Sequence, residues 1–147
     1  MRIVNFLFII LIILVSCKTI TGPDTNPSNY LFYQVQNGWT GKLTNMEIHF
    51  NQKGIIEDEE QKIEFTVSAE ITDSLKILLN DFEKYNHIYA FNCADCPVFR
   101  LKYHSKARSS EVKIFGNYDD EGIPNSLKKV IEFMEEIKLT ELEKELN

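Results

Sequence analysis

The chain has 147 residues, of which 44% are hydrophobic and 26% charged, and its formal net charge is −6. This length predicts one folded domain, and this composition excludes a disordered polymer, a collagen-like repeat and a multi-pass membrane protein. Because an acidic chain without clustered lysines or arginines does not attract a phosphate backbone, no nucleic-acid partner is expected.

The amino terminus has the features of an export signal. Arg2 supplies a positive charge, and residues 6–15 form an unbroken apolar run. A membrane-spanning helix needs about 20 apolar residues and a secretory signal only about 7 to 15, so this run is too short to span. It ends in Leu14-Val15-Ser16-Cys17, which resembles the lipobox of bacterial lipoproteins. Residues 1–16 are therefore predicted to be a lipoprotein signal peptide, the alternative being an ordinary secretory signal or an uncleaved anchor.

The lipobox resemblance implies a lipid anchor at Cys17. In proteins with this motif a diacylglycerol is attached to the cysteine thiol, the signal is cleaved before it, and the new amino group is usually acylated. Two or more acyl chains hold a protein stably on a membrane. Residues 17–29, with two prolines and a glycine, are predicted to form a flexible tether. An aspartate directly after the lipidated cysteine would resemble the retention signal of inner-membrane lipoproteins, but this chain has Lys18 at that position. The outer membrane is therefore favoured, with the domain facing the periplasm or the cell surface.

Residues 30–147 are predicted to form a single domain that begins with β-strands. Alternating apolar residues indicate a strand over 30–36, and Asn37-Gly38 is a turn signal. Further strands are expected over 43–50, 55–58 and 62–69. Together they predict an antiparallel meander with one face exposed to water.

Helices and a second pair of strands follow. Thr72 or Asp73 is expected to cap a helix that runs to about Asn86, because apolar residues recur there at helical spacing. A loop over 89–97 leads to a predicted hairpin of strands 98–105 and 111–115, in which Ile114 and Phe115 compete for the core. The last helix begins near Pro124 and carries an apolar stripe formed by Leu127, Val130, Ile131, Met134 and Ile137.

This order of elements predicts an α+β fold. An antiparallel sheet, made of the meander and the hairpin, should have two amphipathic helices packed on one face. The arrangement resembles a family of uncharacterised small lipoproteins from Bacteroidota-type bacteria, and the resemblance implies a fold without an assigned activity. The matching segments are 46–50 with Gly54, 71–75, 99–103, 112–116 and 124–137.

The sharpest local feature is the pair Cys93 and Cys96. In an exported protein such cysteines are readily oxidised, and with Cys17 committed to lipid these two are left for each other. A loop-closing disulfide is the favoured interpretation. The alternative is a thiol-disulfide oxidoreductase, which would need a reactive thiolate stabilised by a helix amino terminus or a cation. Asp95 lies between the cysteines instead, and a carboxylate raises the pKa of a neighbouring thiol.

Two metal sites can be considered. His87, Cys93, Cys96 and His104 offer zinc ligands, but their spacing matches no zinc finger. Residues 117–122 are similar to the first half of a calcium loop, yet the twelfth position is Lys128 where a glutamate belongs. A polar turn is favoured there, and no metal or other cofactor is expected.

Trp39 lies in a glycine-flanked turn and is either an exposed aromatic contact, near Tyr30 and Tyr33, or a residue that closes one end of the core.

The sequence contains no Gly-rich phosphate loop, no Gly-x-Ser-x-Gly and no His-Glu-x-x-His. The leading hypothesis is therefore a non-enzymatic binding or accessory module of the cell envelope. It would be anchored to a membrane by its N-terminal lipid and would bind another envelope protein. Thiol-disulfide exchange or metal binding by Cys93 and Cys96 is the alternative.

Overall fold

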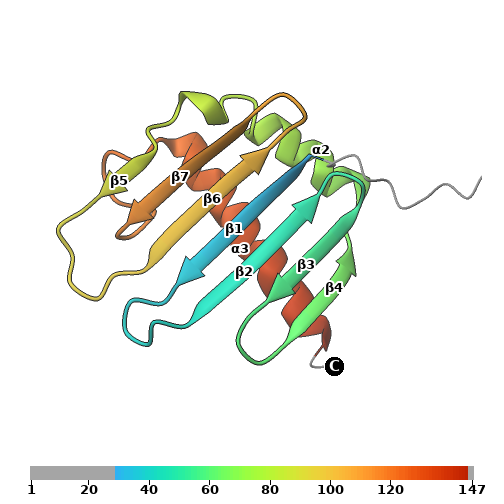
Figure 1. The fold of residues 1–147 in the computed structure, drawn as a ribbon, viewed down its shortest axis with the longest axis horizontal. Helices are drawn as coiled ribbons and strands as arrows, with labels where there is room; N and C mark the ends of the chain where they lie inside the picture. The colour runs from blue at the N-terminus through green and yellow to red at the C-terminus, as the bar shows by residue number, and fades with distance from the viewer. Residues whose placement is uncertain (1–28, 146–147) are drawn as a thin grey trace, which may run out of the picture.

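The computed structural model describes residues 29–145 as an α+β domain with a seven-stranded sheet (Figure 1). The signal peptide, the lipobox and most of the predicted tether lie outside these residues. The strands are ordered β4-β3-β2-β1-β6-β7-β5. Their bounds are Tyr30–Gln36 (β1), Leu43–His49 (β2), Lys53–Glu57 (β3), Lys62–Thr66 (β4), Ile88–Ala90 (β5), Val98–His104 (β6) and Ser109–Phe115 (β7).

The first four strands form the predicted antiparallel meander. Each pairs with the next in the chain, and β1 also pairs antiparallel with β6, so the β6–β7 hairpin extends the sheet on the other side of β1. Tyr33 lies opposite Met46 on one side and Leu101 on the other, and all three side chains are buried. Side chains alternate between the two faces of a strand. We call the face that carries the buried core residues the inner face and the opposite one the outer face.

The edge strand β5 differs from the prediction. Residues 89–97 were expected to be a loop, but Ile88–Ala90 pair with β7, and they do so in the parallel sense. A segment of three residues shows too little alternation to be detected from sequence, and its pairing depends on a partner from later in the chain. Tyr89 enters the core, while Ile88 and Ala90 are exposed.

The first helix, α2, covers Ala69–Leu78, so the expected cap and end were both wrong. Ser68 is the N-cap, and its hydroxyl oxygen accepts a hydrogen bond of 3.2 Å from the Ile71 amide. Thr72 lies inside the helix and is buried. Phe82 remains in the core although it belongs to a separate short 3₁₀ helix, Phe82–Lys84.

The second helix, α3, covers Asn125–Glu145 and passes behind the strands in Figure 1. Its predicted stripe is buried as expected, with Leu127, Val130, Ile131, Met134 and Ile137 all in the core. Ile114 also enters the core, and Phe115 points to the outer face. No helix within residues 29–145 is long and apolar enough to cross a membrane.

One polar contact joins the sheet to α3. The buried hydroxyl of Tyr33 donates a hydrogen bond to Glu135, which also pairs with Lys138. Burial, and then the negative charge of Glu135, raise the pKa of Tyr33 far above its usual value. The tyrosine therefore stays neutral and acts as a permanent donor between the two layers.

Candidate protein-binding surface

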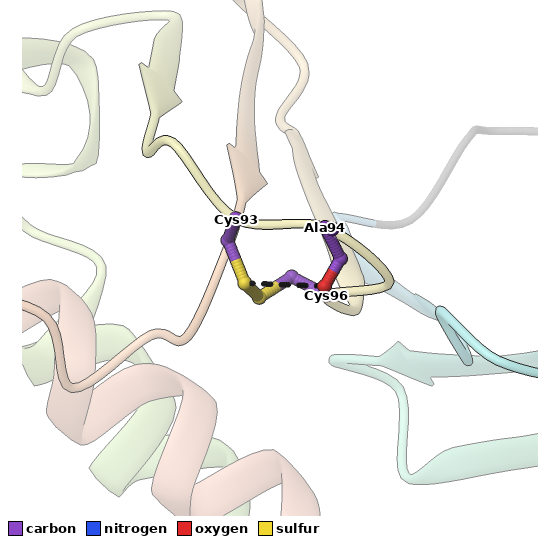
Figure 2. The surroundings of a disulfide bond; sticks show 3 residues. All are labelled: Cys93, Ala94 and Cys96. Carbon is purple, nitrogen blue, oxygen red and sulfur yellow. Dashed lines mark hydrogen bonds between the residues drawn. A yellow bond between two sulfur atoms is a disulfide. The ribbon is translucent and has the colours of Figure 1, made fainter.

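Cys93 and Cys96 lie in the loop that joins β5 to β6, with their sulfur atoms facing each other at bonding distance (Figure 2). Their Cα atoms are 5.7 Å apart, a separation that disulfides commonly bridge. Asp95, between them, has a φ of 59° in the left-handed region, which turns the chain back toward Cys93. The Cys93 sulfur also lies 3.7 Å from the carbonyl oxygen of Ala94. The pair thus closes a tight turn, which we call the disulfide loop (residues 91–97).

The disulfide loop packs against the β1–β2 turn. Gly38 is so close to it that a Cβ atom there would overlap the backbone of Asp95 and Cys96. Within the turn, the side-chain oxygen of Asn37 accepts hydrogen bonds from the amides of Trp39 (2.9 Å) and Thr40 (3.0 Å). Two segments far apart in sequence therefore support each other, and the turn that carries Trp39 has a defined shape.

A cleft of about 300 Å³ lies between these two segments. Its lining includes Gln36, Phe91, Val98 and Phe115, together with the backbone around Gly38 and both cysteines. This volume is at the small end of the range for ligand pockets, which is about 300–1,000 Å³.

Several exposed apolar side chains lie toward the same end of the sheet as the cleft, and one of them, Phe115, lines it. Trp39 is 84% exposed, Ile88 61%, Phe115 41% and Leu43 38%. The sheet register places Leu43 opposite Gln36, Gln36 opposite Val98, and Val98 opposite Phe115, so these residues form one row across the outer face. Of the other large hydrophobic side chains that are exposed in residues 29–145, Ile77 is on α2 and Leu139 on α3. We call Trp39, Leu43, Ile88, Val98 and Phe115 the apolar surface.

Trp39 is thus exposed and does not close the core. Contiguous exposed apolar side chains mark protein or membrane interaction sites more often than scattered single ones do. Tryptophan is also among the side chains most enriched where binding energy is concentrated. Tyr33, which was considered together with Trp39, is buried on the inner face of the sheet. Tyr30 lies at the end of β1 that is far from the β1–β2 turn.

The outer face beside the apolar surface is polar and internally paired. Arg100 donates hydrogen bonds to both carboxylate oxygens of Glu111, at 2.7 and 3.3 Å, and Lys113 lies 3.3 Å from the same group. The hydrogen bond from Arg100 is the largest of the effects that hold the pKa of Glu111 below its ordinary value. These charges pair across neighbouring strands and fix the position of β7 next to β6.

The predicted redox pair has an unfavourable setting for a reactive thiol. The cysteines are followed in the chain by strand β6, so neither stands at the first residues of a helix. The nearest charged residue in sequence is the carboxylate of Asp95, which opposes thiolate formation.

The four zinc-ligand candidates are not brought together. Cys93 and Cys96 lie next to Val98 at the start of β6, whereas His104 lies at the other end of that strand, roughly 20 Å away. There the His104 ring stacks on Tyr30, with ring centroids 5.1 Å apart. The Nδ1 atom of His87 lies 2.9 Å from the carbonyl oxygen of Glu111. Within the part of the chain that the structure describes, no three potential ligands meet.

The segment similar to a calcium loop is a turn between β7 and α3. The ammonium of Lys128 donates a hydrogen bond of 2.6 Å to the carbonyl oxygen of Asp119. This bond joins the first turn of α3 to the turn that precedes it. The predicted polar turn accounts for these residues.

The chain matches no protein-family model, and no curated protein is significantly similar to it. The functional interpretation therefore depends on the chain's own residues. Sequence reasoning missed Leu43, Ile88, Val98 and Phe115, because strand alternation alone does not show that outward apolar residues of four strands lie at the same end of the sheet. Only the pairing register brings them together.

Proposed function

We propose that this chain is a lipid-anchored, non-enzymatic protein of the bacterial cell envelope that binds another envelope protein through the apolar surface. The observation that supports binding is that Trp39, Leu43, Ile88 and Phe115 are each more than a third exposed and come from the β1–β2 turn and the outer face of neighbouring strands, toward the end of the sheet that holds the cleft. Phe115 lines that cleft. An apolar cluster of this kind is costly to leave in water and gains free energy when a partner covers it.

The position of the predicted anchor agrees with this role. Cys17 precedes Tyr30, where β1 begins, and β1 runs from there to Gln36 beside the cleft. A strand of seven residues is roughly 20 Å long. A lipid at Cys17 would attach to the Tyr30 end of the sheet through the predicted flexible tether, which leaves the end that carries the apolar surface unattached. We also infer that both helices cover the inner face, which leaves the outer face free for a partner.

The outer membrane is the proposed location, and the test of the anchor is the Cys17→Ala variant. We expect it to lose the labelled acyl chain and to leave the membrane fraction, because a signal without an acylated cysteine gives no stable attachment. A Cys17→Ala protein that stays membrane-bound would contradict the anchor.

The test of binding is cross-linking in native membranes with Trp39→Ala. We expect the yield of cross-linked partner to fall about tenfold or more, as for a tryptophan at the centre of an interface. The matched control is Ile77→Ala, which removes another strongly exposed apolar side chain, on α2, and should leave the yield unchanged. Equal yields from both variants would reject the apolar surface as the binding site.

The alternative is thiol-disulfide exchange by Cys93 and Cys96. An insulin reduction assay distinguishes it, because the proposed binding protein should show no reductase activity above background. Activity that is present and lost in Cys93→Ser would replace the binding role with an enzymatic one.

A further inference from the structure

The outer edge of β5 has backbone groups that pair with no other strand of the described chain. Among residues 29–145, β5 pairs only with β7 and ends the sheet. Toward β7, the carbonyl of His87 accepts from the Lys113 amide and the Phe91 amide donates to the Phe115 carbonyl, both at 2.9 Å. Because residues in a parallel pair bond to the neighbouring strand at every second position, the backbone groups of Ile88 and Ala90 point the other way. They are available to a further strand.

The opposite edge of the sheet has the charged side chains that block strand addition, and β5 does not. On β4, the amide of Val67 and the carbonyl of Gln61 bond toward β3, so Lys62, Glu64 and Thr66 present their backbone groups outward. Two of these three carry exposed charges. The run His87-Ile-Tyr-Ala-Phe-Asn92 contains no aspartate, glutamate, lysine or arginine. Natural sheets protect exposed edges with charges, so an unprotected edge indicates either an aggregation hazard or a binding site.

The apolar surface continues to this edge. Ile88 lies opposite Lys113 on the outer face, and the next outward residue, Ala90, lies opposite Phe115. Phe91, which follows β5, lines the cleft together with Phe115. A strand placed beside β5 would therefore have alternate side chains over Ile88 and toward Phe115.

We propose that β5 receives an extended segment of the partner protein as an eighth strand. This segment would have apolar side chains on the outer face and no charged residue opposite Ile88 and Ala90. This inference rests on the proposed function and identifies the kind of partner. Main-chain hydrogen bonds supply affinity in such strand addition, and the alternate side chains supply specificity. The uncharged edge favours an uncharged segment, since an aspartate or lysine there would lose water beside Ile88 without gaining an ion pair.

Two β5 edges related by a two-fold axis would pair antiparallel. A second copy of this chain is therefore the alternative occupant of this edge, and the cross-linking test distinguishes it from a segment of a different protein.

The test uses the full chain in the membranes of cells that make it, with a photoreactive phenylalanine analogue at position 88. Ala90→Pro removes the outward amide of β5 and leaves the bonds to β7 in place, since proline is tolerated where the amide faces away from the sheet. Glu64→Pro makes the same change on the β4 edge and is the matched control. We expect Ala90→Pro to lower the yield of cross-linked partner about tenfold or more, and Glu64→Pro to leave it within about twofold. Hydrogen exchange should also show slower exchange of the Ile88 and Ala90 amides in membranes than in the purified protein.

Several outcomes would overturn the proposal. They are a cross-link from position 88 that Ala90→Pro leaves unchanged, a cross-link to a second copy of this chain, no cross-link at all, or Ile88 and Ala90 amides that exchange equally fast in both settings. A second probe, the same photoreactive analogue placed at position 39, separates the two proposals. If the partner still cross-links to this probe while β5 gives none of the expected effects, strand addition is wrong and the proposed binding function stands. Purified Ala90→Pro with unchanged urea unfolding excludes a folding defect as the cause.

Discussion

Two tyrosine hydroxyls in the packed layers differ in whether they have a partner. Tyr33 donates to Glu135 between the sheet and α3, whereas the buried hydroxyl of Tyr85 has no hydrogen-bond partner within residues 29–145. We expect Tyr33→Phe to lower the free energy of unfolding by about 1.5–3 kcal/mol, since a bond to a charged group is lost. Tyr85→Phe should be neutral or stabilising, because it removes a hydroxyl that lost water without compensation. Urea unfolding of both variants measures the difference, and equal losses would contradict it.

Gly38 determines whether the two segments around the cleft can touch. Its absent Cβ leaves room for the backbone of Asp95, so Gly38→Ala should separate the β1–β2 turn from the disulfide loop at a cost of about 1–3 kcal/mol. Gly41, in the same turn, is the control, because a Cβ there meets nothing within 4 Å although its φ of +70° is unfavourable for alanine. We expect only Gly38→Ala to speed hydrogen exchange in residues 91–97. Faster exchange in both variants would show that the turn, and not the contact, matters.

At the scale of elements, long segments were predicted well and short ones poorly. In the meander β1–β4 and in helix α3 the apolar pattern repeats several times, so the residues that its spacing assigns to the core are the ones that are buried. In the segment predicted as one helix up to about Asn86, the periodic residues Leu75 and Phe82 are both buried. They belong to two separate helices, because the same spacing continues across the break after Leu78. The parallel strand β5 has three residues and a partner later in the chain, so no local pattern identifies it.

The outer face of β6 and β7 gives a pH-dependent prediction. Arg100 and Lys113 keep the pKa of Glu111 below 4.5 in the folded state, so this carboxylate stabilises the fold above its unfolded pKa. The contribution is lost as the pH falls through the lower, folded pKa, where Glu111 becomes protonated. Glu111→Gln should therefore destabilise the protein by up to about 1 kcal/mol at pH 7, since the pair is partly exposed. Urea unfolding at pH 7 and pH 3 measures this difference, which should shrink at the lower pH; a constant difference would assign the effect to packing.

At the scale of the whole molecule, the candidate site depends on contacts that no single segment encodes. Trp39 could be singled out from sequence, as could Cys93 and Cys96, but their proximity could not. It follows from the order β1-β6-β7-β5, which places the β1–β2 turn and the disulfide loop at the same end of the sheet (Figure 1). The same order places the apolar surface opposite the Tyr30 end. The two ends of the sheet therefore have different roles in the proposal, one for attachment and one for binding.

The disulfide loop should matter more for this binding end than for the stability of the whole fold. Its two cysteines are three positions apart, and closing so short a loop removes little entropy from the unfolded chain. We expect the double variant Cys93→Ser with Cys96→Ser to lower the free energy of unfolding by no more than about 2 kcal/mol. The same variant should raise hydrogen exchange in residues 91–97 and reduce cross-linking of the partner from position 39, because one wall of the cleft loses its fixed shape. A much larger loss of stability would show instead that the disulfide holds β5 and β6 in the sheet, whereas unchanged cross-linking would show that the partner does not use this wall.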